Sequence, residues 1–133
     1  MTSILTKELL FTVGEEHFLD DLSPTNKTIA VIFEDDGDTG YFYAVNIENG
    51  IKILDTLHIY NVKNVVDKAQ PSLAQIVWSR DGLNGALLIN HYAHAVFNFD
   101  QCRGYCRSGF PPPSPNSTKY GHEWDDQALI PFK

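Results

Sequence analysis

Four carboxylates lie within five residues of one another and form the most conspicuous polar cluster in this sequence. Such a cluster can bind Ca²⁺ or Mg²⁺, but its spacing lacks the alternating ligands and the distal glutamate of an EF-hand loop. Aspartate and glycine are also the residues that a tight turn requires for its own backbone geometry. We therefore expect a solvated hairpin tip that binds no metal and presents its charge to a partner. The partner-binding residues that we expect are Glu34, Asp35, Asp36 and Asp38, with help from Glu15, Glu16, Asp20 and Asp21.

Histidines and cysteines in the C-terminal half are the second group of residues that can do chemistry. Imidazoles and thiolates together can complete a tetrahedral zinc site, but Cys-x3-Cys is looser than the common Cys-x2-Cys pattern. We therefore expect no metal ion and no cofactor. The alternative is a small metal-binding protein or enzyme that uses the cluster within residues 91–122, which comprises His91, His94, Cys102, Cys106 and His122.

Nucleophilic catalysis requires a Ser, Cys or Thr beside a base that a third group orients. Cys106 stands near Arg103 and Arg107, which could lower the pKa of its thiol, but no family-specific signature surrounds it. The sequence also lacks a Gly-rich phosphate loop, a His-Glu-x-x-His motif and a Gly-x-Ser-x-Gly motif. We expect no catalytic residue, and a protein that is not an enzyme.

The elements that would position these residues are mainly strands. Residues 28–33 and 41–47 are β-branched and aromatic runs on either side of the acidic cluster, which predicts a hairpin with an acidic tip. Asn49-Gly50 then favours a tight type I′ turn and an antiparallel pairing of residues 41–47 with residues 51–57.

The rest of the chain continues in the same way. We expect strands over residues 9–14, 73–79, 83–90 and 95–99, an acidic loop over 15–27, a short helix over 62–68, a polyproline-like strap over 110–115 and one short helix over 123–130. The predicted class is α+β and mainly antiparallel β, with a single meander-type sheet of five to six strands. The chain length of 133 residues predicts one domain over residues 1–133.

The net charge of −7 is unevenly distributed. Residues 1–60 carry eleven acidic and three basic side chains, whereas residues 61–133 carry six and seven, which gives −8 and +1. A negative field repels the phosphates of nucleic acid and of anionic lipid and favours basic partners. The sequence has no apolar run long enough to span a membrane and no secretory signal. We therefore expect a cytoplasmic protein that binds neither nucleic acid nor membrane.

Several segments resemble one known family. They are residues 31–43, His58-Ile59-Tyr60-Asn61-Val62, Trp78-Ser79-Arg80-Asp81-Gly82 and Gly104-Tyr105-Cys106-Arg107. The chain is similar over about residues 27–110 to a family of small bacterial proteins catalogued as a domain of unknown function. The family carries no assigned activity, so the resemblance implies a bacterial, cytoplasmic origin and transfers no catalytic residue.

These observations together favour a protein-binding module. Its most concrete form is an immunity protein or antitoxin that neutralises a basic bacterial toxin through the acidic surface. A third interpretation is a small-ligand sensor that uses the aromatic residues of the sheet face, for which the sequence offers no discriminating pattern. The oligomeric state is not determined by these patterns.

Overall fold

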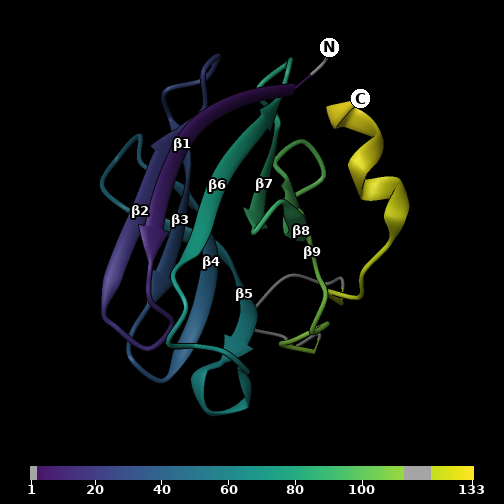
Figure 1. Ribbon diagram of the computed structural model, residues 1–133. Coiled ribbons are helices and arrows are strands. Elements are labelled where there is room, and N and C mark those ends of the chain that lie inside the picture. The colour runs from purple at the N-terminus through teal and green to yellow at the C-terminus, as the bar shows by residue number, and fades with distance from the viewer. Residues whose placement is uncertain (1–2, 113–120) are drawn as a thin grey trace.

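Two antiparallel sheets pack face to face in the computed structural model, which describes residues 3–112 and 121–133 (Figure 1). Sheet A has the strand order β1-β6-β7-β8-β9, and sheet B has the order β2-β3-β4-β5. The strands are β1 (Ser3–Phe11), β2 (His17–Leu22), β3 (Ile29–Asp35), β4 (Thr39–Asn46), β5 (Lys52–Asn61), β6 (Ser72–Ser79), β7 (Asn84–Ile89), β8 (Tyr92–Asn98) and β9 (Arg103–Cys106).

The prediction of a single meander sheet is therefore wrong, although the antiparallel character is confirmed. The chain makes two meanders, β2 to β5 and β6 to β9, and β1 joins the second by pairing with β6. A single sheet of these strands would leave one apolar face in water, whereas two stacked sheets bury the inner face of each. The α+β class is also wrong, because the helical elements are short 3₁₀ segments, η1 (Val62–Asn64) and η2 (Asp126–Phe132).

The hydrophobic core lies between the two sheets. Alternate residues of each strand point inward, and the largest of them are at most 1% exposed. Sheet B contributes Phe33, Phe42 and Leu57, and sheet A contributes Trp78 and Leu87. This rigid stack fixes the outward-facing residues of both sheets, which are the ones available to a ligand.

The hairpin between β4 and β5 confirms one prediction and corrects another. The two strands pair antiparallel around Asn49-Gly50, as expected. However, the last pair of the ladder is Asn46 with Lys52, so the connection has five residues instead of two. Gly50 has a φ of +86°, but Asn49 is not among the residues with positive φ, so a type I′ turn is excluded.

Two strands escaped the sequence analysis. β2 was expected to be part of an acidic loop, and β9 was not expected at all. Both are edge strands, where solvent covers one side and charged residues are tolerated. The helix expected over 62–68 is reduced to η1, the terminal helix lies at Asp126–Phe132, and residues 113–115 of the expected strap lie outside the described residues.

Two features of this architecture position the candidate sites. The β1–β2 loop and the β3–β4 turn meet at one end of the sandwich, where the Gly14 amide donates a hydrogen bond of 2.8 Å to Asp35. The C-terminal segment with η2 lies beside sheet A, away from β2 and β3 (Figure 1). In the part of the chain that is described, no helix is long and apolar enough to cross a membrane.

Candidate functional site

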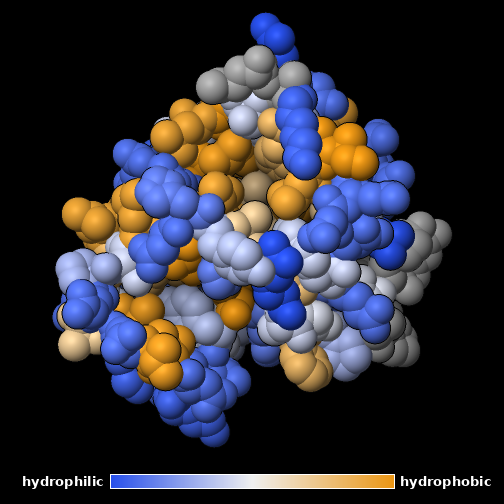
Figure 2. Space-filling view, turned by 45° about the vertical axis from the view of Figure 1, so that its right-hand side comes forward, coloured by the Kyte–Doolittle hydropathy of each residue, from blue (hydrophilic) through white to orange (hydrophobic). Residues whose placement is uncertain are grey.

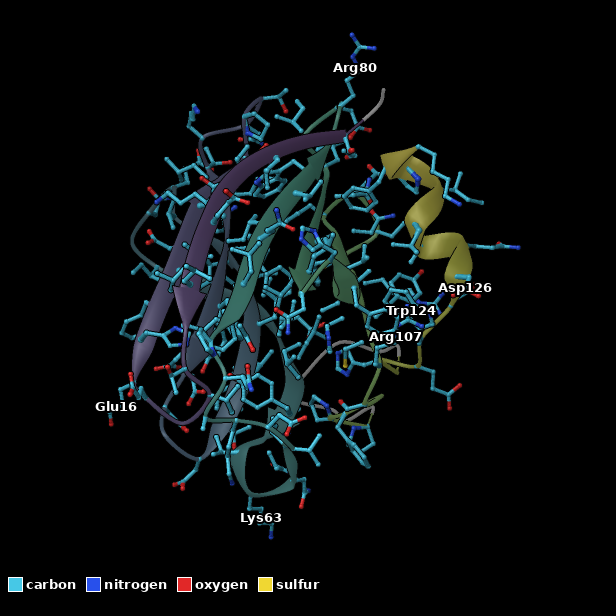
Figure 3. The ribbon with its side chains drawn as sticks, in the orientation of Figure 1. Glu16, Lys63, Arg80, Arg107, Trp124 and Asp126 are labelled. Atoms are coloured by element: carbon cyan, nitrogen blue, oxygen red, sulfur yellow. The ribbon has the colours of Figure 1, made fainter. Side chains whose placement is uncertain are left out.

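Exposed carboxylates gather at the end of the sandwich where the β1–β2 loop meets the β3–β4 turn. The Cβ position of Gly37 lies 3.9 Å from Cγ of Glu16, which places the two connections in direct contact. Glu16 projects away from the body of the molecule (Figure 3). We call this group the acidic end, and it comprises the exposed residues Glu15, Glu16, Asp36 and Asp38.

A buried carboxylate holds the acidic end in place. Asp35 is 1% exposed and accepts hydrogen bonds from the Gly14 amide at 2.8 Å, the Gly37 amide at 2.8 Å and the Tyr60 hydroxyl at 2.7 Å. Burial, followed by the hydrogen bond to Asp35 and its charge, raises the pKa of Tyr60, so this hydroxyl remains a donor. The two connections are therefore fastened to one another and to β5 through one side chain.

The turn has a second internal brace at Asp36. Its carboxylate accepts hydrogen bonds from the Asp38 amide at 2.9 Å and the Thr39 amide at 2.8 Å, which lower the pKa of Asp36. The carboxylate remains ionised at neutral pH while it organises the turn. Asp36 thus both stabilises the β3–β4 turn and contributes negative charge to the surface.

An open row of aromatic and polar side chains adjoins the acidic end. Phe18 of β2 lies opposite Glu34 of β3, Glu34 opposite Tyr41 of β4, and Tyr41 opposite His58 of β5. Residues directly opposite one another share a face of the sheet. Phe18 is 67% exposed, and the Tyr41 and His58 rings meet edge to face with centroids 5.1 Å apart.

Tyr43 and Asp20 extend this row along the same outer face of sheet B. The Tyr43 ring stacks on Tyr41 at 5.7 Å, and its hydroxyl donates a hydrogen bond of 2.7 Å to Glu34. Burial and this hydrogen bond raise the pKa of Tyr43 and fix the Glu34 carboxylate among the rings. We call the surface the aromatic face, and it comprises Phe18, Asp20, Glu34, Tyr41, Tyr43 and His58.

The eight carboxylates expected at a partner site do not all reach solvent. Asp35 is buried, and Asp21 accepts hydrogen bonds from the Trp78 indole at 3.0 Å and from the Thr6 hydroxyl, which tie β2 to sheet A. These two residues therefore act inside the fold. Of the other six, four form the acidic end, and Asp20 and Glu34 lie on the outer face of sheet B.

Two lysines border the acidic end on one side. Lys63 and Lys68 line a recess of about 460 Å³ with Asp38 and Thr39. Lys68 is fastened there, because its ammonium donates a hydrogen bond of 3.2 Å to the Val62 carbonyl. The segment around η1 therefore places two cations beside Asp38 at the acidic end.

A second buried aspartate joins β5 to the C-terminal segment. Nε2 of His122 lies 2.8 and 3.0 Å from the two oxygens of Asp55, and Nδ1 lies 2.5 Å from the Pro111 carbonyl oxygen. Both neighbours are hydrogen-bond acceptors, which favours the ring with protons on both nitrogens. Burial alone lowers the pKa of His122, but the hydrogen bonds to Asp55 and Pro111 and the charge of Asp55 outweigh it and raise that pKa.

This pair does not have the arrangement of a nucleophile and its base. In such a site one ring nitrogen of the histidine faces the orienting carboxylate and the other faces a Ser, Cys or Thr. In His122 the second nitrogen faces a main-chain carbonyl. The pair therefore serves to fasten Pro111 and the residues around His122 to the inner side of β5.

The other histidines and cysteines of the alternative metal-binding hypothesis are dispersed. Cys106 is buried with its thiol 3.4 Å from the Ser108 hydroxyl. Cys102 is exposed, and partial desolvation of its thiol together with the charge of Asp55 raises its pKa. His91 is exposed, and His94 is a partly buried bulge residue of β8. Within residues 3–112 and 121–133, no three His, Cys, Asp or Glu side chains are grouped closely enough to hold a metal ion.

Sequence reasoning missed several residues of these sites. Asp55 stands two residues before Leu57 on β5, so strand alternation could have placed it inside the sandwich. His58 could have been placed opposite Tyr41 from the hairpin register, although the bulges in β4–β5 shift that register. Phe18 gave no signal, because β2 was not recognised as a strand.

Comparisons with known proteins identify relatives without an assigned activity. A protein of Haemophilus influenzae (strain ATCC 51907 / DSM 11121 / KW20 / Rd) described as an uncharacterized protein is 45% identical over 85 residues, which are 63% of this chain and 53% of the relative. The chain thus spans about half the length of this curated relative. No solved structure matches.

The match to the family model covers more of the chain than the resemblance over about residues 27–110. The match extends over residues 11–133, from the last residue of β1 to the end of η2, and includes the acidic end, the aromatic face and the Asp55–His122 pair. The chain belongs to the family of uncharacterized proteins conserved in bacteria known as DUF2251.

Proposed function

We propose that the protein is a non-enzymatic binding module that docks a basic protein partner on the acidic end and the aromatic face. The observation that carries this proposal is the continuity of the two surfaces. Glu34 lies in the aromatic row, and the chain runs from it through Asp35 directly into the exposed carboxylates Asp36 and Asp38. One partner can therefore meet charge and aromatic rings together.

The chemistry of the surface favours Arg and Lys side chains. Carboxylates pair with guanidinium and ammonium groups, and the faces of tyrosine and phenylalanine attract the same cations. Phe18 and Tyr41 offer such rings beside Glu34. The centre of a protein interface is typically rich in aromatic residues, and the charged rim speeds the encounter.

Rigidity also supports a docking role. The acidic end is braced through Asp35, and the aromatic face lies on paired strands of sheet B. Few side chains lose conformational freedom when a partner binds to a surface of this kind. A protein that is preorganised in this way can bind tightly with a modest interface.

The partner class that fits best is a toxin domain that acts on nucleic acid, because such a domain presents a basic cleft to phosphates. A carboxylate cluster on a rigid turn can occupy that cleft and increase the association rate by about 10- to 10³-fold at low salt. The proposal thus includes a role as an immunity protein or antitoxin in the cytoplasm.

The product of the neighbouring gene is the partner to test first. Association is measured by biolayer interferometry across a salt series for the parent protein and for a Glu16→Gln/Asp38→Asn variant. We expect the variant to associate several-fold more slowly at low salt and to show a shallower salt dependence. Phe18→Ala is expected to increase mainly the dissociation rate.

A matched control removes two exposed carboxylates elsewhere, with Glu48→Gln/Asp100→Asn. This variant has the same net charge as the test variant, so a purely global charge effect would slow both equally. Equal slowing would contradict the proposed surface. An absence of any association with the neighbouring gene product would contradict the proposed role as an immunity protein or antitoxin.

A further inference from the structure

A mainly apolar cleft separates η2 from the outer face of sheet A. Its volume is about 470 Å³, within the usual range of small-molecule sites. Figure 2 shows hydrophobic residues on both sides of a recess on the upper part of this face. Val77, Ala86, Leu88 and Ala93 of the sheet form the floor, and Leu129 and Phe132 of η2 form the wall.

Two of the residues that line this cleft carry cationic side chains. Arg107 and Lys133 contribute to its lining together with His91, and no carboxylate side chain does. This is unusual for a chain with 17 acidic and 10 basic residues. The cleft therefore combines apolar walls with a positive margin on a molecule whose overall charge repels anions.

Arg107 is held in one position at this margin. Its guanidinium carbon lies 4.4 Å from the centre of the Tyr92 ring and 3.8 Å from the centre of the Trp124 ring, and Nε donates a hydrogen bond of 2.9 Å to the Ala93 carbonyl. Figure 3 shows Arg107 and Trp124 side by side next to η2. Both rings thus contact the guanidinium through cation–π interactions, which restrict its orientation and do not use its N–H donors.

The terminal nitrogens of Arg107 retain donors for a ligand. The nearest carboxylate is that of Asp126, which is 4.0 Å from one of them, beyond hydrogen-bond distance, and 87% exposed. In the described part of the chain these nitrogens have no hydrogen-bond acceptor. A guanidinium with a fixed orientation and free N–H groups is suited to bind a carboxylate through two parallel hydrogen bonds.

We propose that this cleft binds a linear amphipathic anion of the fatty-carboxylate class. The alkyl chain lies between Leu88 of sheet A and Phe132 of η2, and the carboxylate lies at Arg107 with Lys133 contributing charge. The site lies on sheet A, so it is separate from the partner surface proposed on sheet B. An inorganic phosphate would contact only the cations at the margin of the cleft. An alcohol with an alkyl chain of equal length would contact only the apolar walls.

Calorimetric titration with dodecanoate, kept below its micelle concentration, tests the site on the intact protein. We expect saturable binding at one site, about tenfold or more weaker binding of dodecanol, and about fourfold tighter binding for each methylene added from octanoate to dodecanoate. Arg107→Gln should weaken dodecanoate binding by about tenfold or more and leave dodecanol binding nearly unchanged.

Two further variants distinguish binding in the cleft from a general effect of charge. Lys63→Gln removes an exposed cation at the opposite end of the molecule and should not change binding (Figure 3). Ala93→Phe fills the floor and should abolish binding of both ligands while the Arg107 side chain is retained. Equal affinity for dodecanoate and dodecanol, or unchanged binding in Ala93→Phe, would overturn the proposal, as would the absence of saturable binding.

Discussion

Two aspartates are buried on the inner side of sheet B, and the protein satisfies them in different ways. Asp35, at the end of β3, accepts hydrogen bonds from two main-chain amides and the Tyr60 hydroxyl. Asp55, on β5, accepts them from the Thr56 amide and from the imidazole of His122, a residue 67 positions away in the sequence. Both carboxylates accept several hydrogen bonds, but only Asp55 has a donor whose charge changes with pH.

Asp35 and Asp55 therefore attach two parts of the molecule through donors of different kinds. The bonds to Asp35 fasten the acidic end with donors that carry no charge, so they persist over the whole range in which the carboxylate is ionised. The Asp55–His122 attachment is complete only with an imidazolium, because its two ring nitrogens face two acceptors and a neutral ring can donate to only one of them. The proposed partner surface is therefore held independently of histidine charge, whereas the C-terminal segment is not.

Removal of one member of the ionic pair should have the largest effect. His122→Ala leaves the buried Asp55 carboxylate without its cationic partner and with only the Thr56 amide as a donor, and we expect it to lower the free energy of unfolding by about 3–5 kcal/mol in urea denaturation. His58→Ala removes an outward-facing histidine of the same strand and should cost less than about 1 kcal/mol. Equal losses in the two variants would contradict the role of the pair.

The double variant Asp55→Ala/His122→Ala sharpens the same comparison. With both charges removed, no buried ion remains, and we expect a loss well below the sum of the two single losses. A strictly additive result would show that the two side chains act independently. The cycle thus measures the coupling that the 2.8 Å contact implies.

Changes at Asp35 should have a smaller effect. Asp35→Ala leaves two amides and a hydroxyl without their acceptor, but water can reach the turn, so we expect a loss of about 2–3 kcal/mol. Asp35→Asn keeps one acceptor oxygen and should lose less than Asp35→Ala. Asp36→Asn, at the exposed turn, should lose at most about 0.5 kcal/mol. Urea denaturation that ranks the three variants in another order would contradict the bracing role of Asp35.

The smallest expected effects are on the pH dependence of stability, and they have opposite signs at two histidines. The raised pKa of His122 means that its contribution is present below about pH 6.5 and is lost as the pH rises through the folded-state pKa. His17 lies opposite Asp35, but its buried ring nitrogens have no hydrogen-bond partner among the described residues. Burial lowers the pKa of His17, so stability is lost as the pH falls below about 6.5.

Unfolding free energies measured from pH 5 to pH 8 test both signs. His122→Gln should remove the decline of stability on the alkaline side, and His17→Phe should remove the decline on the acid side. Each slope is limited to about 1.4 kcal/mol per pH unit for one proton. The same slope in the parent protein and in both variants would show that neither histidine controls the pH dependence.

Part of this organisation could be predicted from local sequence. The β3–β4 hairpin with its acidic tip and the β4–β5 pairing followed from β-branched and aromatic runs around turn formers. The exposed positions of Asp36 and Asp38 followed from the same turn chemistry. β2 could not be predicted in the same way, because its Asp20 and Asp21 are tolerated only by its place at the sheet edge.

The sequence by itself determined most of the strands, the β3–β4 and β4–β5 hairpins and the excess of negative charge in the N-terminal half, because these depend on residues close together in the chain. Only the tertiary structure decided that β1 pairs with β6, that Asp55 meets His122, and that Arg107 lies between Tyr92 and Trp124. The physical reason is that these contacts form when two apolar faces stack, and stacking is set by the burial of the whole core rather than by any local pattern.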